Sequence, residues 1–245
     1  MIHFKDSYIP DDSYTNLINS KEFKTRLDIL NERLRQSLVE NNFPPVIIGN
    51  IFYDHLQVKP PFFNSPLNEE CIRKRARVAR AAQESTNMFE IGLNGGHSSF
   101  LALSSNPSLK VTANDIAAPF IVHPEIYAPV AAKILKHFFN DRFSFIKGNC
   151  LHQVPIYVNK NKNTEIDLVH LDGAKSTYKQ DFLNLIPILK DGALVIFDDF
   201  QQGGIRAQAR DLKQAGFLHD DSNYPTTDLK KYRLTNEILR YKKPE

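Results

Sequence analysis

Glu-Ile-Gly-Leu-Asn-Gly-Gly-His-Ser, residues 90–98, joins a short apolar run to a helical stretch, and this junction decides the fold. Glycines at such a junction let the backbone approach a ligand that a Cβ atom would keep away. They stand at positions 92, 95 and 96, which differs from the Gly-x-Gly-x-x-Gly spacing typical of dinucleotide sites. The stretch therefore predicts a nucleoside-binding turn after the first strand of a sheet and weakens a dinucleotide interpretation.

Around this turn, short apolar runs alternate with helical stretches. The runs are 88–91, 109–113, 143–146, 166–171 and 193–197, and the helical stretches are 97–105, 125–140, 176–190 and 204–215. This alternation predicts a parallel sheet covered by helices on both faces. Two later strands, 217–221 and 237–241, have no helix between them, so we expect an antiparallel hairpin at one edge. The predicted class is α/β: a Rossmann-like, doubly wound, mostly parallel seven-stranded sheet with an antiparallel C-terminal strand and an N-terminal helical extension.

The first 67 residues have a different pattern. Residues 1–19 are polar and irregular, whereas apolar residues at helical spacing predict an amphipathic helix over 21–41. The stretch 43–66 is rich in proline and reads as a loop. A helix is then expected from Asn68 to about Gln83. We expect 1–67 to form an arm, helix and Pro-rich loop, and 68–245 to form the α/β domain; the helix over 21–41 would cover the active site or mediate a homodimer.

Acidic residues stand where the predicted strands end. Asp115 follows the second strand and can accept hydrogen bonds from ribose hydroxyls, as in either class of nucleoside cofactor. Asp172 follows the fourth strand, and Asp198-Asp199 follow the fifth. Neighbouring parallel strands open into one crevice, so these three carboxylates would repel one another without a cation or proton between them. Oxygen ligands of this kind suit Mg²⁺ or a similar divalent ion.

Composition excludes several classes of function. The 31 Lys and Arg against 28 Asp and Glu give a formal net charge of +3, too small to indicate a nucleic-acid partner. The two cysteines, Cys71 and Cys150, form no zinc motif and predict no disulfide framework. The N-terminus has no signal-peptide pattern, and no apolar run is long enough for a membrane span. We therefore expect a cytoplasmic protein that does not bind membranes.

The glycine turn and the acidic strand ends together resemble a known family. Glu90, Gly92, Gly96 and Ser98 match the SAM-binding motif of class I methyltransferases, where SAM is S-adenosylmethionine. Within that class, residues 68–245 are most similar to the metal-dependent catechol and caffeoyl-CoA O-methyltransferases and their bacterial relatives. In that group an Asp ends the fourth strand, a Lys follows three residues later and Asp-Asn ends the fifth strand. Asp172, Lys175 and Asp198-Asp199 fall on this pattern, with Asp199 standing where the group usually has Asn.

The resemblance implies a role for each of these residues. Glu90 and the backbone at Gly92 and Gly96, helped by Ser98, would hold the methionine end of SAM. Asp115 would hold the ribose, and Asn149 and Cys150 lie where this group contacts adenine; Cys150 is equally well a small buried filler. The expected metal ligands are Asp172, Asp198 and Asp199. The implied reaction is metal-assisted methylation of a small-molecule hydroxyl, with Asp172 and Lys175 as catalytic residues and Lys175 as the base if its pKa is lowered.

Other polar residues are open to two interpretations. The basic run Arg73, Lys74, Arg75, Arg77 and Arg80 suits an acidic ligand but more often forms a solvated helix face. His170 is more typical of a satisfied core histidine than of a ligand. His97 could contact SAM, and His123 and Tyr127 could line an acceptor pocket.

Four competing functions stand beside the O-methyltransferase. An NAD(P)-dependent oxidoreductase would leave Asp172, Lys175 and Asp198-Asp199 without a role. A nucleic-acid methyltransferase lacks support, since no Asn/Asp-Pro-Pro-aromatic motif or nucleophilic Cys follows the fourth strand. Two alternatives remain open. One is a non-catalytic SAM-binding scaffold or regulator, and the other is a related enzyme that keeps the fold and metal but performs another reaction.

Overall fold

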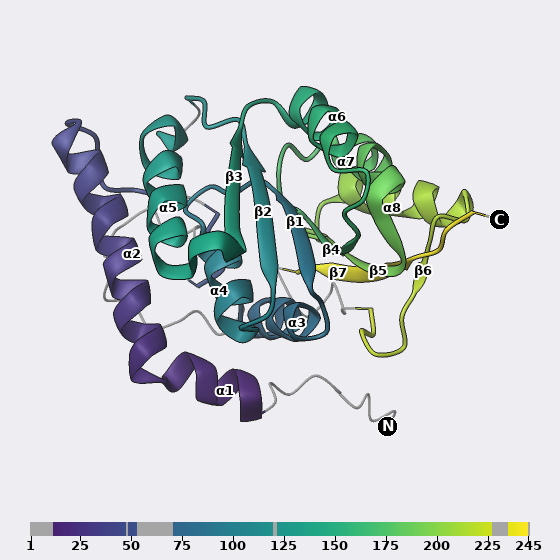
Figure 1. Ribbon diagram of the computed structural model, residues 1–245, viewed down its shortest axis with the longest axis horizontal. Helices are drawn as coiled ribbons and strands as arrows, with labels where there is room; N and C mark the ends of the chain where they lie inside the picture. Colours follow the sequence, from purple (N-terminus) through teal and green to yellow (C-terminus); the bar gives the residue numbers. More distant parts are fainter. Residues whose placement is uncertain (1–11, 48, 53–70, 120–121, 227–234, 245) are drawn as a thin grey trace.

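The alternating apolar runs form one seven-stranded sheet in the computed structural model, which describes residues 12–47, 49–52, 71–119, 122–226 and 235–244 (Figure 1). The strand order is β3-β2-β1-β4-β5-β7-β6. The strands are β1 (Asn87–Ile91), β2 (Lys110–Asp115), β3 (Phe143–Lys147), β4 (Ile166–Leu171), β5 (Leu189–Phe197), β6 (Leu218–Asp220) and β7 (Glu237–Tyr241). All five apolar runs and both late strands of the prediction are present.

The sheet is parallel from β3 to β5, and β7 runs antiparallel to both of its neighbours, β5 and β6. The hairpin at one edge and the mostly parallel sheet were both expected, so the predicted Rossmann-like class is confirmed. The order reverses at β1, because β2 and β3 lie on one side of it and β4 and β5 on the other. A crevice opens at the carboxyl ends of the strands at such a switch point.

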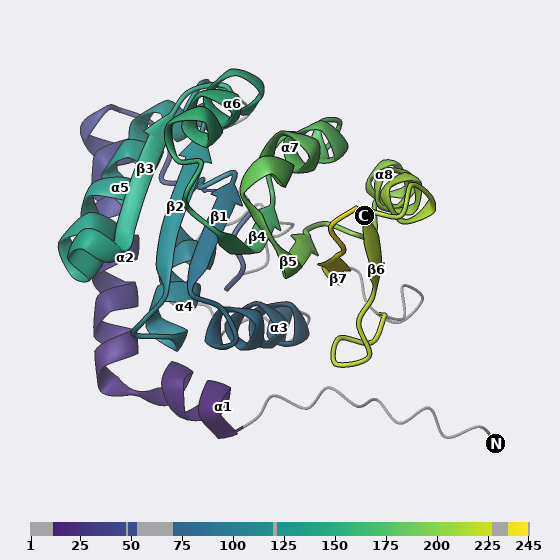
Figure 2. The same cartoon turned by 45° about the vertical axis from the view of Figure 1, so that its right-hand side comes forward.

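Helices cover both faces of the sheet, as Figure 2 shows from the side. One face packs against α1 (Asp12–Asn19), α2 (Lys21–Glu40), α3 (Ile72–Gln83), α4 (His97–Ser105) and α5 (Pro124–Phe139). The other packs against α6 (Cys150–Lys160), α7 (Tyr178–Leu185) and α8 (Gly203–Gln214). Side chains alternate along each strand, so Met88 lies in the first core and Phe89 in the second.

The N-terminal segment is part of the first core. Apolar residues of α2 at helical spacing are buried: Phe23, Leu27, Leu30, Leu34 and Leu38. The helix begins at the predicted residue, where the Ser20 hydroxyl caps it by accepting the Phe23 N–H at 3.2 Å. One expectation was wrong: residues 12–19 are not irregular but form α1, whose Tyr14 is buried.

Two further elements differ from the prediction. α6 was not predicted, because only Val154 and Val158 of this helix are buried and Pro155 interrupts its pattern. Its start is nevertheless fixed by Asn149, whose side chain accepts the Leu151 N–H at 3.0 Å. The stretch 176–190 forms the shorter α7, followed by a 3-10 turn, Ile186–Ile188. The expected helix start at Asn68 and the boundary at residue 67 lie outside the described residues. Among the described residues, no helix is long and apolar enough to cross a membrane.

Candidate active site

Backbone hydrogen bonds beyond the strands hold their carboxyl ends together. The Gly92 N–H donates to the Asn114 carbonyl at 2.8 Å, which joins the turns after β1 and β2. The Asp172 N–H donates to the Ile91 carbonyl at 2.8 Å, and the Asp198 N–H donates to the Leu171 carbonyl at 3.0 Å. The acidic residues predicted at three strand ends are therefore brought to one edge of the sheet by the parallel ladder itself.

The turn after β1 needs glycine at two of its positions. Gly92 has φ of +99°, and a Cβ atom there would lie 2.4 Å from the backbone oxygen of Asp172. Gly96 has φ of +75° and caps α4, where a Cβ atom would lie 2.9 Å from Leu135. Only glycine adopts these angles without strain, so the sequence interpretation of this turn is correct in its geometry.

Glu90 lies beneath this turn. Its carboxylate is fully buried and accepts hydrogen bonds from the hydroxyls of Ser98, at 2.5 Å, and Ser99. Its third partner is Nδ1 of His170, at 2.8 Å, on the strand directly opposite. Neither Glu90 nor Gly96 lines the cavity described below, whereas Ser98 does. Glu90 is thus placed to hold the shape of the turn from inside.

His170 is the partner that the sequence analysis expected to be a satisfied core residue. It is fully buried, and although burial lowers its pKa, the hydrogen bond and charge of Glu90 raise it overall. Its other nitrogen, Nε2, lies 3.9 Å from an oxygen of Asp198 and has no hydrogen-bond partner among the described residues.

Asp115 fixes the turn from the side of β2. Its two oxygens accept the N–H groups of Asn94 and Ala117, each at 2.7 Å. The Asn94 side chain accepts the Tyr127 hydroxyl at 2.6 Å and donates to the Gly49 carbonyl at 3.1 Å. The carboxylate lines the cavity and has lone pairs left for a ligand, as the ribose assignment requires.

Asn149 and Cys150 lie at the start of α6 and line the same cavity. Burial raises the pKa of the Cys150 thiol to about 12, and its hydrogen bond to Asp181 adds to the shift. The thiol is therefore protonated at neutral pH and is no nucleophile.

Residues of the N-terminal segment also reach the site. Nε2 of His97, at the start of α4, lies 2.8 Å from the Asn31 side-chain oxygen and 3.4 Å from the Asn50 amide nitrogen. Burial lowers the pKa of His97 to about 3, so the ring is neutral at physiological pH. His97 and Tyr127 both line the cavity. His123 is absent from the lining among the described residues and instead stacks on Phe43 with ring centroids 3.6 Å apart.

The three carboxylates after β4 and β5 meet two lysines. Lys175 Nζ lies 2.8 Å from Asp172 Oδ1 and 2.9 Å from Asp199 Oδ2. Lys74, from α3, reaches the cluster from the other side, with its Nζ 2.7 Å from Asp198 Oδ1 and 3.7 Å from Asp199 Oδ1. Asp199 has φ of +51°, an uncommon backbone angle for a residue other than glycine. We call these five residues the acid–lysine cluster.

The pKa shifts follow from this arrangement. Burial alone would lower the pKa of Lys175, but Asp172, Tyr178 and the other carboxylates raise it well above its ordinary value. The lowered pKa that a lysine base needs is therefore not found. Burial raises the pKa of Asp198 to about 6, against the opposing effect of Lys74. For Asp199, the two lysines outweigh burial and hold its pKa below the ordinary value.

Lys74 was missed because its helix reads as a solvated basic face. The structure shows otherwise: Lys74, Arg75 and Arg77 are all buried. The Arg75 Nε donates to the Tyr14 hydroxyl at 2.8 Å, and Arg77 Nη1 donates to the Pro225 carbonyl at 2.7 Å. A signal was present in the sequence, since Lys74 precedes Val78 and Ala81 at helical spacing and so shares their apolar face.

The cluster does not fit a divalent ion in the way the sequence predicted. Among the described residues, the donor atoms that converge within 4.8 Å of one another come from His170, Asp172 and Asp198, and Asp199 is not among them. The Asp198 oxygen nearest α3 already binds the Lys74 ammonium. An ion bound there would lie close to that positive charge, which opposes its binding.

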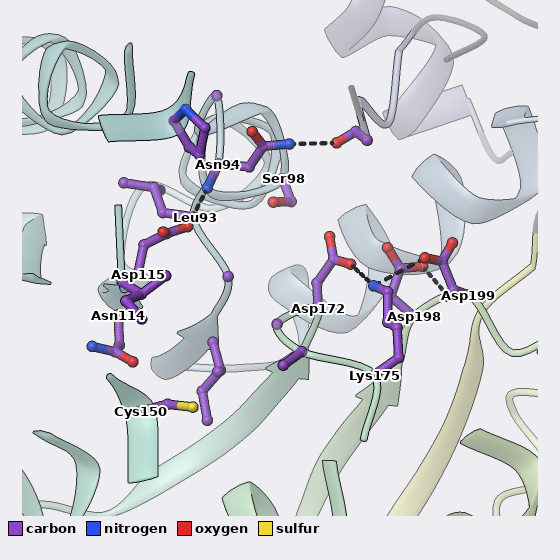
Figure 3. A pocket seen from close by; sticks show the side chains of 18 of the residues that line it. Leu93, Asn94, Ser98, Asn114, Asp115, Cys150, Asp172, Lys175, Asp198 and Asp199 are labelled. Carbon is purple, nitrogen blue, oxygen red and sulfur yellow. Dashed lines mark hydrogen bonds and ion pairs between the residues drawn. The ribbon is translucent and has the colours of Figure 1, made fainter. Parts of the chain in front are cut away.

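A single cavity of about 820 Å³ joins the glycine turn to the acid–lysine cluster. Figure 3 shows Asn94, Asn114, Asp115 and Cys150 on one side of it, and Asp172, Lys175, Asp198 and Asp199 on the other. Its wall also includes Asn50 and Ile51 from the N-terminal segment and Val122 and Pro124 from the start of α5. The volume is within the range of small-molecule sites.

Comparison with known proteins gives one domain match and a set of structural neighbours. Residues 89–200 match the model of a methyltransferase domain family. No curated protein matches the chain in sequence. Among solved structures, the chain is similar to the O-methyltransferase TomG from Streptomyces achromogenes, in complex with SAM, at 17% identity and a TM-score of 0.59; the match covers 95% of this chain and 96% of TomG.

Two other solved structures agree. The O-methyltransferase from Bacillus cereus in complex with SAH has 17% identity and a TM-score of 0.57, over 88% of this chain and 91% of that one. A protein assigned as a caffeoyl-CoA O-methyltransferase from Staphylococcus aureus has 18% identity and a TM-score of 0.55, over 91% of this chain and 100% of that one. Residues 89–200 therefore match a methyltransferase domain family, and the chain has the fold of these O-methyltransferase structures.

Proposed function

We propose that this protein transfers the methyl group of SAM to a hydroxyl of a small molecule. The observation that carries the proposal is the single cavity, which is lined at one end by the glycine turn and Asp115 and at the other by the acid–lysine cluster. A cofactor bound at the first end would lie next to an acceptor molecule bound at the second end of the same cavity. The O-methyltransferases that share the fold support the reaction class.

The residues present fit SAM. Gly92 lines the cavity and lets the turns after β1 and β4 pack together there, and the Asp115 carboxylate lines the cavity as an acceptor for ribose hydroxyls. Asn149, Cys150 and the exposed Leu151 line the part that would receive the adenine. SAM, when bound, supplies a methyl group on a sulfonium, which an oxygen nucleophile attacks in line.

The chain would orient the acceptor and remove its proton. Asp172 is half-buried and lines the cavity, so its carboxylate can accept the hydrogen of an acceptor hydroxyl. Lys175 stays a cation, because its pKa is raised, and so would donate a hydrogen bond to the acceptor oxygen rather than take its proton. Methyl transfer of this kind depends mostly on orientation.

The divalent ion implied by the sequence resemblance has no part in this proposal. The donors present do not fit it while Lys74 holds Asp198, so we route no step through a metal. The homodimer, the cytoplasmic location and the small-molecule nature of the acceptor stay predictions. The outer face of α2 carries the exposed Ile29 and Val39, which a second copy could cover.

The test is calorimetric titration with SAM, S-adenosylhomocysteine and NADH, followed by detection of S-adenosylhomocysteine with a panel of catechols, simple phenols and sugar hydroxyls. We expect both SAM-type ligands to bind and NADH not to bind. Lys175→Met should keep SAM affinity and lose turnover, whereas Lys179→Met, at an exposed ion pair with Asp211, should change neither. Binding of NADH without SAM would refute the proposal, as would SAM binding with no transfer to any hydroxyl of the panel.

A further inference from the structure

The ammonium of Lys74 is the least expected group in the acid–lysine cluster. It belongs to α3, whereas the carboxylates follow β4 and β5, so the tertiary fold alone brings them together. Its side chain is 9% exposed and that of Asp198 is 4% exposed. A buried ion pair at 2.7 Å is costly to break, since either charge alone would remain in a poorly solvated place.

Lys74 and Lys175 flank Asp199. Oδ1 of Asp199 lies 3.7 Å from Lys74 Nζ, and Oδ2 lies 2.9 Å from Lys175 Nζ. Asp172 and Asp198 each have one of the two lysines within 2.8 Å. Every carboxylate of the cluster is thus already next to a positive charge from the protein itself.

A divalent ion needs carboxylate oxygens as ligands, and these lysines already contact several of them. Mg²⁺ and Mn²⁺ take about six oxygen ligands at roughly 2.0–2.2 Å, with carboxylate lone pairs pointed at the ion. Here Asp198 Oδ1 points at Lys74, and Asp172 Oδ1 points at Lys175. An ion bound through either of these oxygens would have to displace the ammonium that contacts it.

We infer that Lys74 is the resident cation of this cluster and that it holds Asp198 and Asp199 in place of a divalent metal. As to catalysis, the inference rests on the proposed function: methyl transfer would then need no added metal. Lys74 acts as a positioning residue through the two carboxylates.

The experiment measures Mn²⁺ binding by electron paramagnetic resonance in the full chain and in Lys74→Met, with Lys179→Met as the matched control. We expect no binding to the wild-type chain or to the control at about 1 mM Mn²⁺, the weak end of protein sites for divalent ions. Lys74→Met should bind Mn²⁺ at least about tenfold more tightly than the wild type, because one neighbouring positive charge is gone. Adding Asp172→Asn to Lys74→Met should remove the gained site. A merely structural lysine would give no new Mn²⁺ signal.

Two results would overturn the inference. One is Mn²⁺ binding to the wild-type chain that Asp172→Asn abolishes; the other is a folded Lys74→Met chain that binds no Mn²⁺. If Lys74→Met does not fold, Lys74→Gln replaces it. Mn²⁺ binding to the wild-type chain that depends on Asp172 would overturn the inference whichever variant is used. SAM titration of the same preparations separates the two proposals: failure to bind SAM refutes the proposed function, while the Mn²⁺ result still judges the role of Lys74.

Discussion

Replacing Gly92 by alanine tests the close contact between the turns after β1 and β4. The backbone at Gly92 has φ of +99°, which costs an alanine roughly 1–2 kcal/mol. The new Cβ atom would also lie 2.4 Å from the Asp172 oxygen and 2.8 Å from the Gly173 nitrogen, both backbone atoms. Moving such atoms adds about 1–3 kcal/mol, as overpacking does in cores. We therefore expect Gly92→Ala to lower the free energy of unfolding by about 2–5 kcal/mol.

Two other glycines separate these contributions. Gly216 has φ of +80° but nothing within 4 Å of an added Cβ atom, so Gly216→Ala should lose only the roughly 1–2 kcal/mol of backbone strain. Gly204 lies in α8 with open space around it, and Gly204→Ala should be neutral or stabilising by up to about 1 kcal/mol.

Urea unfolding of the three variants and calorimetric titration with SAM measure both consequences. The displaced Asp172 backbone should weaken SAM binding by more than about tenfold in Gly92→Ala, equivalent to about 1.4 kcal/mol, and leave it unchanged in the other two. The reasoning is refuted if Gly92→Ala is no less stable than Gly216→Ala and binds SAM equally well.

Three further predictions concern individual polar side chains. Burial holds the pKa of His97 at about 3 against an ordinary 6.5, so its stabilising contribution is complete above pH 6.5 and is lost as the pH falls toward 3. Each pH unit in that window should cost about 1.4 kcal/mol, and urea unfolding at pH 7 and 5.5 should show a smaller loss in His97→Gln. Asp115→Ala should weaken SAM binding by at least about tenfold, since hydrogen bonds to charged groups are worth roughly 1.5–3 kcal/mol; unchanged calorimetric affinity would exclude the ribose assignment. Arg77→Met removes a buried guanidinium beside Glu237 and should destabilise by about 3 kcal/mol, while Arg80→Met on the same helix should cost under about 1 kcal/mol in the same urea assay; equal losses would contradict this.

The parts of the fold that local pattern controls could be predicted from the sequence. The glycine turn, the strand ends at Asp115 and Asp172 and the helix over 21–41 all depend on neighbouring residues, and the structure has each in place. Because parallel strands end at the same edge of the sheet, the sequence alone could predict that the three carboxylates lie in one cluster.

The features that the sequence did not predict depend mostly on contacts between residues distant in sequence. Nothing near Lys74 indicates that its ammonium will meet Asp198, more than a hundred residues later, and the basic run around it favours solvent. Glu90 was expected to contact the cofactor, but its pairing with His170 depends on the register between β1 and β4, which the sequence does not display. The direction of the Lys175 pKa shift is only partly a distant effect: burial lowers the pKa, Asp172 and Tyr178, both three residues away in sequence, raise it most, and Asp199 and Asp198 after β5 add to the rise.

The contact of His97 with Asn31 bears on the order in which the molecule assembles. α2 is synthesised early, but its asparagine finds the histidine only after the first strand and its turn have left the ribosome. Contacts between residues so distant in sequence form later than a local helix, so the apolar face of α2 is uncovered until then. The cavity wall is then completed only when this early segment docks, and the ability to hold a cofactor should appear late in folding, together with the burial of Leu30 and Leu34.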